Sequence, residues 1–178
     1  MKVKLIIATI ITMAIYSNFS MAGGKHKHAH DSEGSSVGAP AGASKASRTI
    51  KVTTKDSMRY EFSSELNLKA GEVIKFVVTN VGIIDHEFSV GDAKEQESHQ
   101  AMMLKMPNMV HEDGNTVTVK PGETKELTWK FSADADVVFA CNIPGHFQSG
   151  MFKKVTVKGP ADESQTSSRD NKAKKHKH

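Results

Sequence analysis

Apolar and polar side chains alternate along most of residues 48–158, with the period of two that is typical of half-buried β-strands. Turn sequences containing Gly, Pro, Asn and Asp separate the alternating stretches. Many short strands with this spacing predict a β-sandwich or a small barrel. The apolar positions of the predicted strands are Leu66 and Leu68; Ile74, Phe76 and Val78; Val117 and Val119; Leu127, Trp129 and Phe131; Val137, Phe139 and Cys141; and Val155 and Val157.

One stretch, at about residues 93–106, departs from this alternation. It has few β-branched residues, and His99, Met102, Met103 and Met106 recur at the spacing of one helix face. A proline directly after it marks the predicted end of the helix. The sequence therefore predicts an all-β sandwich that carries one helical insertion.

The first 22 residues have the pattern of a secretory signal peptide. Lys2 and Lys4 give a positive start, residues 5–15 form an apolar run, and a small-x-small cleavage sequence occupies residues 20–22. The apolar run is shorter than the ~20 residues that a membrane-spanning helix needs. We therefore predict export to a bacterial-type periplasm and a mature form without a membrane span.

The segments that flank the predicted domain are polar. Residues 23–47 and 159–178 offer little apolar surface, so burial cannot offset the entropy lost on ordering them. We expect a flexible, His-containing N-terminal segment at 23–47 and a disordered basic tail at 159–178. A single folded domain at 48–158 lies between them.

The charge distribution argues against nucleic-acid binding by this domain. The whole chain has a net charge of +4. Residues 48–158, however, hold 14 basic and 15 acidic side chains, so the excess positive charge belongs to the ends. We expect no nucleic-acid partner.

The chain has a single cysteine, Cys141, which excludes an internal disulfide, a multi-cysteine zinc site and a four-cysteine iron–sulfur cluster. Cys141 follows a predicted strand and shares its inward face with Phe139. His146 and Met151 follow in the spacing C-x4-H-x4-M. Alone, a buried Cys or Met usually only fills space. Together with one more imidazole, these side chains are the donor set of a blue-copper centre.

The second imidazole has to come from elsewhere in the chain, because one loop cannot enclose the metal alone. His86 is the best candidate, since it directly precedes a predicted strand that starts at Phe88. Thiolate, two imidazoles and a thioether then come from two distant parts of the sequence.

With these motifs, residues 48–158 resemble the cupredoxins, the small blue-copper proteins related to plastocyanin, azurin and auracyanin. The resemblance is strongest at residues 85–88 and 141–151. It implies a Greek-key β-sandwich and one type 1 copper that cycles between Cu(II) and Cu(I). The matching positions imply His86, Cys141 and His146 as equatorial ligands and Met151 as the axial ligand.

Within that family, the chain looks most like periplasmic cupredoxins associated with copper tolerance, which can carry His- and Met-rich additions. It departs from plastocyanin and azurin at Asp85, where those proteins commonly have Asn. The hydrogen bond that the Asn provides toward the thiolate loop is therefore in question here.

Two further groups of residues are candidate ligands for additional, weakly bound copper. An alternating His tract near the mature N-terminus is typical of divalent-metal binding, and a solvated polar tail is the alternative. Thioethers on the predicted helix suit Cu(I), and the packing face of a helix is the alternative. The candidates are His26, His28, His30, His99, Met102, Met103, Met106, Met109 and His111.

The sequence lacks the signatures of the copper enzymes. Ala140 and Asn142 flank Cys141, where a multicopper oxidase needs His-Cys-His and a copper nitrite reductase needs an adjacent His. A dinuclear copper centre needs two cysteines. We therefore expect an electron-transfer protein rather than an enzyme.

Two functions remain open at this point. One is copper homeostasis or tolerance, through a periplasmic copper-binding protein that transfers single electrons. The other is a dedicated electron shuttle between respiratory partners, with no role in tolerance. The expected partners are the copper ion and an unidentified periplasmic redox or copper-handling protein, and we expect a monomer.

Overall fold

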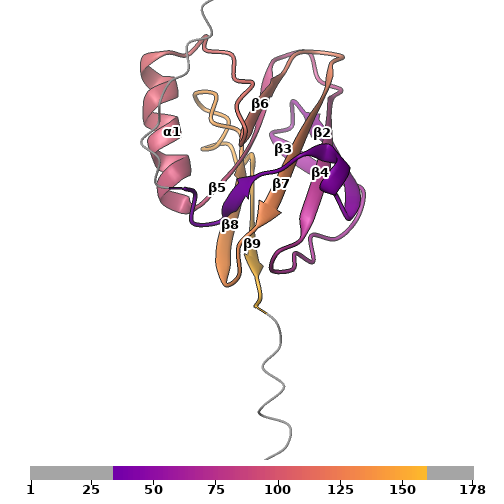
Figure 1. Ribbon diagram of the computed structural model, residues 1–178. Coiled ribbons are helices and arrows are strands. Elements are labelled where there is room, and N and C mark those ends of the chain that lie inside the picture. Colours follow the sequence, from indigo (N-terminus) through magenta and orange to yellow (C-terminus); the bar gives the residue numbers. More distant parts are fainter. Residues whose placement is uncertain (1–33, 160–178) are drawn as a thin grey trace, which may run out of the picture. The chain divides into compact units, whose positions relative to one another are not determined.

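The computed structural model describes residues 34–159. The predicted signal peptide, the candidate ligands His26, His28 and His30, and nearly all of the predicted C-terminal tail lie outside these residues. Within them, the strands are β1 (Gly38–Pro40), β2 (Arg48–Lys55), β3 (Arg59–Phe62), β4 (Val73–Asn80), β5 (His86–Gly91), β6 (Thr116–Val119), β7 (Thr124–Phe131), β8 (Ala135–Ala140) and β9 (Phe152–Val157); the helices are α1 (Ala93–Lys105) and a 3-10 turn, η1 (Ala43–Lys45) (Figure 1).

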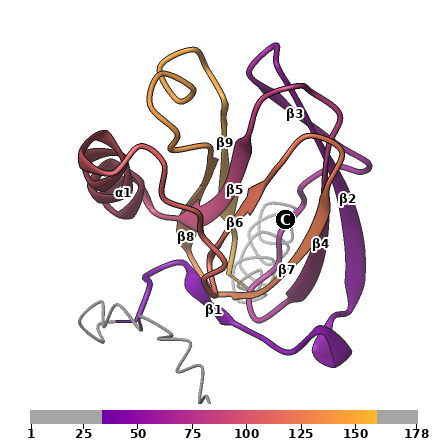
Figure 2. The same cartoon turned by 90° about the horizontal axis from the view of Figure 1, so that it is seen from above.

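The strands form two sheets that pack face to face. One sheet has the order β1-β7-β4-β2-β3 and the other has the order β6-β5-β8-β9. Neighbouring strands are antiparallel, except for the parallel pair β2 and β4. Seen from above, the sheets lie side by side and α1 covers the outer face of the four-stranded sheet (Figure 2). This arrangement confirms the predicted β-sandwich with one helical insertion.

Aromatic side chains fill the core between the sheets. The rings of Phe76, Phe88 and Phe139 are fully buried, and their centroids lie 5.2–5.4 Å apart. Each buried ring of this size stabilises the fold by roughly 1.5–3 kcal/mol. Because Phe88 and Phe139 lie on neighbouring strands β5 and β8, the core fixes the ends of both strands, where His86 and Cys141 are found.

The predicted helix at 93–106 is confirmed as α1. Asp92 caps its first turn, accepting a hydrogen bond from the Glu95 amide while the Glu95 carboxylate accepts one from the Asp92 amide. The buried Gln96 side chain donates to the Val138 carbonyl of β8 at 2.9 Å, which anchors the helix on the sheet. No helix within residues 34–159 is long and apolar enough to cross a membrane.

Two details of the strand pattern differ from the sequence prediction. Leu66 and Leu68 alternate as in a strand, but their segment makes no ladder and holds only an isolated bridge between Lys69 and Lys158. Leu68 is nevertheless buried in the core. The alternation of apolar and polar residues therefore marks which side chains of this loop are buried, and it does not mark a strand.

The sheet also begins before the domain boundary that we predict at residue 48. β1 pairs with β7, and Val37 beside it is buried. The indole of Trp129 donates to the Val37 carbonyl at 3.3 Å. Residues 38–40 of the polar segment 23–47 therefore belong to the sandwich, because their backbone pairs with β7.

Candidate metal centre

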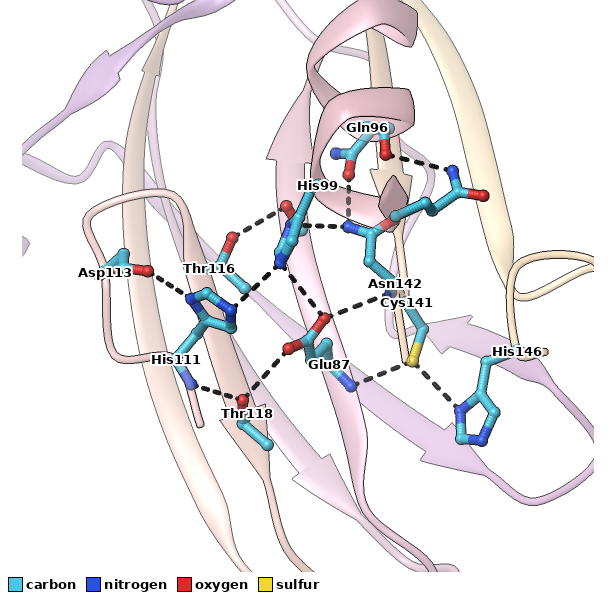
Figure 3. Close-up of polar contacts among 12 residues, drawn as sticks. Glu87, Gln96, His99, His111, Asp113, Thr116, Thr118, Cys141, Asn142 and His146 are labelled. Atoms are coloured by element: carbon cyan, nitrogen blue, oxygen red, sulfur yellow. Dashed lines mark hydrogen bonds and ion pairs between the residues drawn. The ribbon is translucent and has the colours of Figure 1, made fainter. Parts of the chain in front are cut away.

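The structure brings Cys141, His86 and His146 together at one end of the sandwich. One donor atom of each lies within 4.8 Å of the other two. The Cys141 Sγ lies 3.3 Å from Nδ1 of His146 (Figure 3), and the two imidazole rings lie 5.2 Å apart between centroids. These are the three equatorial ligands that the sequence predicts.

His86 is held by one ring nitrogen and presents the other. It is fully buried at the start of β5, and its Nε2 lies 3.1 Å from Oδ1 of Asp56. Its Nδ1 is buried and has no hydrogen-bond partner in the structure. A buried ring nitrogen without a partner, beside a thiol and a second imidazole, fits a copper ion.

Asp56 is a further residue of the site, and the sequence pattern does not predict it. Hydrogen bonds from the Ile83 amide and from His86 lower the pKa of the Asp56 carboxyl group, so that it is ionised at neutral pH. A carboxylate that accepts the second N–H of a metal-binding His fixes the orientation of the ring and raises its basicity. No local signal marks Asp56, which lies in the turn after β2.

The loop from Cys141 to Met151 is closed by its own backbone. The Cys141 amide donates to the Met151 carbonyl, and the Met151 amide donates to the His146 carbonyl, both at 3.0 Å. Gly145 and Gly150 have φ values of +88° and +97°, a region that L side chains rarely adopt. Met151 is fully buried next to this junction. The residues with the spacing C-x4-H-x4-M therefore form one loop, which its own backbone hydrogen bonds close.

The buried environment of the thiol disfavours a free thiolate. Burial raises the pKa of Cys141 to about 12, so the metal-free side chain is a neutral thiol. The Glu87 amide donates to Sγ at 3.2 Å. This hydrogen bond comes from the backbone, so it does not depend on the Asp85 side chain, which is exposed.

Burial lowers the pKa of both imidazoles. Desolvation is the largest effect on His86 and on His146, and it outweighs the opposing effect of the Asp56 carboxylate. Neutral imidazoles are the form that binds metals, because a proton would otherwise occupy the donor nitrogen.

The candidate accessory ligands of the helical region differ in their burial and in their contacts. His99 and His111 lie in contact, with their Nε2 atoms 3.3 Å apart. Met103 is fully buried, as expected for a packing residue, whereas Met106 is 41% exposed. Met102 and Met109 are half-buried. A role for these methionines in binding copper stays a prediction.

Residues 46–158 match the family described as "Copper binding proteins, plastocyanin/azurin family". The chain belongs to this family, the blue-copper cupredoxins, and copper is its cofactor. The family that the sequence resembles is thereby confirmed.

Curated relatives carry the description "Copper-resistant cuproprotein CopI". The protein from Vibrio cholerae serotype O1 is 50% identical over 121 residues, which cover 68% of this chain and 72% of the relative. The protein from Pseudomonas aeruginosa is 36% identical over 163 residues, which cover 75% of this chain and 89% of the relative. Both are similar to this chain over most of their own length.

Solved structures with the same fold include two auracyanins. Auracyanin from Roseiflexus castenholzii has a TM-score of 0.53 and 21% identity, and the match covers 63% of this chain and 98% of that protein. Auracyanin A from Chloroflexus aurantiacus has a TM-score of 0.50 and 21% identity, with coverages of 62% and 98%. At these identities, the comparison supports the fold alone.

Proposed function

We propose that this chain is an exported, periplasmic type 1 copper protein that transfers single electrons and serves copper tolerance. Its ligands are His86, Cys141, His146 and Met151. The observation that carries the proposal is the meeting of one thiol and two imidazoles, one with a buried, unpartnered nitrogen. The relatives described as copper-resistant cuproproteins support the role in tolerance.

Copper would supply one-electron chemistry at this site, where Cys141, His86 and His146 would hold it. The Glu87 amide, which donates to Cys141 Sγ, stabilises negative charge on the sulfur. The Asp56 carboxylate, which accepts from His86, keeps that ring in one orientation. Electron transfer then requires little rearrangement of the chain.

An electron carrier also needs a surface through which a partner approaches the metal. The loop between β4 and β5 exposes Ile83 and Val81, which are 85% and 58% accessible. The Ile83 amide donates to the same Asp56 carboxylate that holds His86. We therefore assign this apolar loop as the contact surface for the redox or copper-handling partner.

We also propose that the chain is exported and has no enzymatic activity. The pattern of residues 1–22 supports a cleaved signal peptide. The neighbours of Cys141, Ala140 and Asn142, support single electron transfer, because no His next to the thiolate connects it to a second copper.

Deleting the gene is expected to make cells more sensitive to copper salts. The wild-type gene should restore growth, and a Cys141→Ser gene should not, because the thiolate is the ligand on which the centre depends. Growth over a range of copper concentrations measures the effect. A Gln148→Ala gene, altered at an exposed position of the same loop, serves as the control.

Unchanged copper tolerance in the deletion strain, combined with the loss of one respiratory activity, would contradict this proposal. It would support the dedicated electron shuttle instead. In the complemented strain, the protein should be recovered from the periplasmic fraction without residues 1–22.

Replacing Asp56 with Asn is expected to raise the reduction potential of the copper centre. Without the carboxylate, His86 is a weaker donor, and the loss is larger for Cu(II) than for Cu(I). A tenfold loss of Cu(II) affinity alone corresponds to about 59 mV. Redox titration of the visible absorption band measures the shift.

Asp85→Asn is the matched control for Asp56→Asn. It removes the same charge one residue from His86, but its side chain is exposed, so solvent screens the effect. Equal shifts in both variants would show that Asp56 acts only as a nearby charge and not through its hydrogen bond to the ring.

A further inference from the structure

A second cluster of metal-binding side chains lies outside the proposed copper site. It consists of Glu87 on β5, His99 on α1 and His111 in the segment between α1 and β6 (Figure 3). One donor atom of each lies within 4.8 Å of the other two. Glu87 is fully buried, and His111 is 7% exposed.

The spacing of the donor atoms suits a small cation. Nε2 of His99 lies 3.3 Å from Nε2 of His111 and 3.8 Å from Oε2 of Glu87. Two nitrogens bound to one tetrahedral ion at ~2.0–2.1 Å lie about 3.3–3.4 Å apart. The imidazoles are therefore at coordination spacing, and the carboxylate needs only a small shift.

The groups around the cluster resemble the outer shell of a metal site. Nδ1 of His111 lies 2.6 Å from Oδ2 of Asp113, which leaves Nε2 facing the cluster. Such carboxylate–histidine pairs are typical of protein metal sites. The Thr118 hydroxyl donates to Oε1 of Glu87 at 3.4 Å. The Asn142 side-chain NH2 donates to Nδ1 of His99 at 2.8 Å, so an ion on Nε2 requires that amide to turn its unpartnered Oδ1 toward Nδ1–H.

The donor set identifies the class of ion. Two imidazoles and one carboxylate suit borderline divalent cations such as Zn(II), whereas Cu(I) prefers thiolate and thioether ligands. The His99 side chain is 12% exposed, so an ion can reach the cluster from solvent.

We propose that Glu87, His99 and His111 form a second metal site, which binds a borderline divalent cation and is separate from the thiolate centre. This inference goes beyond the proposed function and does not depend on it. A hydrogen-bonded network without a metal is the alternative.

The two sites are linked through the backbone. The amide of Glu87 donates to Sγ of Cys141, and Asn142 directly follows Cys141. A dication on the Glu87 carboxylate adds positive charge close to the copper, which favours Cu(I) over Cu(II). Occupancy of the second site should therefore raise the reduction potential of the copper centre.

The test measures Zn(II) binding to the full chain after one equivalent of Cu(II) has been added. Competition with a chromogenic chelator gives the affinity. The background carries alanine at residues 26, 28 and 30, so that the N-terminal His tract does not contribute. We expect one tight Zn(II) site in this background.

Glu87→Gln and His99→Gln should each weaken Zn(II) binding by about 100-fold or more, since loss of a ligand exceeds the loss of an outer-shell partner. Asp113→Asn keeps all three ligands and should weaken binding about tenfold. Glu97→Gln, on the exposed side of the same helix, is the matched control and should leave the affinity unchanged.

Equal Zn(II) affinity in the ligand variants and in the control would overturn the proposal and leave a structural network. Far-UV circular dichroism and thermal unfolding show which variants fold. If Glu87→Gln and His99→Gln do not fold, Asp113→Asn tests the site instead, because a substitution at the exposed Asp113 should leave the protein folded. Unchanged binding in that variant would then contradict the site, and weakened binding would support it.

Zn(II) should also raise the reduction potential of the copper centre in the background protein but not in Glu87→Gln.

Discussion

Replacing Cys141 with Ser is expected to abolish the intense visible absorption band of the Cu(II)-loaded protein. The band arises from charge transfer between the thiolate sulfur and copper, and a hydroxyl group cannot replace a soft thiolate ligand. The Cys141 side chain is fully buried beside His146. The chain has no second cysteine whose thiol could replace it. Absorption spectra after addition of one equivalent of Cu(II) measure the result.

Ser149→Ala is a suitable control for Cys141→Ser, because it alters an exposed hydroxyl in the same loop. It should keep the band. A Cys141→Ser protein that keeps its fold and still shows the band would contradict the ligand assignment. The wavelength of the wild-type band would also establish whether the centre is blue or green.

Replacing Asn80 with Ala should lower the free energy of unfolding by about 2–4 kcal/mol, because it removes hydrogen bonds from buried groups. The fully buried Asn80 side chain donates to the carbonyls of Ile84 and Val119 at 2.7 and 2.9 Å. It also accepts from the Gly82 amide at 2.8 Å. These contacts tie the loop that precedes His86 to both sheets. Urea unfolding followed by circular dichroism measures the loss.

Asn67→Ala gives the comparison for Asn80→Ala. Asn67 is exposed, and its side chain donates only to the exposed Glu65 carboxylate. Its replacement should change the free energy of unfolding by less than about 0.5 kcal/mol. A similar small loss for both variants would show that the Asn80 contacts do not hold the loop in place.

The sequence alone predicts the sandwich, the helix and the meeting of His86 with the cysteine loop. The alternation of apolar and polar residues correctly predicts β4 and β7, because buried and less buried positions alternate along these strands. The spacing of Cys141, His146 and Met151 points to one kind of centre because few other functions require it, and their role as copper ligands stays a prediction.

What the sequence does not predict depends on long-range packing. Asp56 reaches His86 only because the turn after β2 packs beside the loop before β5. Glu87 is buried because α1 covers the outer face of β5, where every residue is buried. Alternation carries no information in a strand that is covered on both faces.

The closed backbone of the loop between Cys141 and Met151 also bears on how the protein would acquire its metal. Backbone hydrogen bonds close the chain between Cys141 and Met151 without using any side-chain donor of the proposed centre. Zinc fingers, in contrast, fold only when the metal arrives, so their uptake includes a folding step. Because these bonds do not involve the proposed ligand atoms, we expect the sandwich to stay folded when copper is removed and to take up copper again without a folding step.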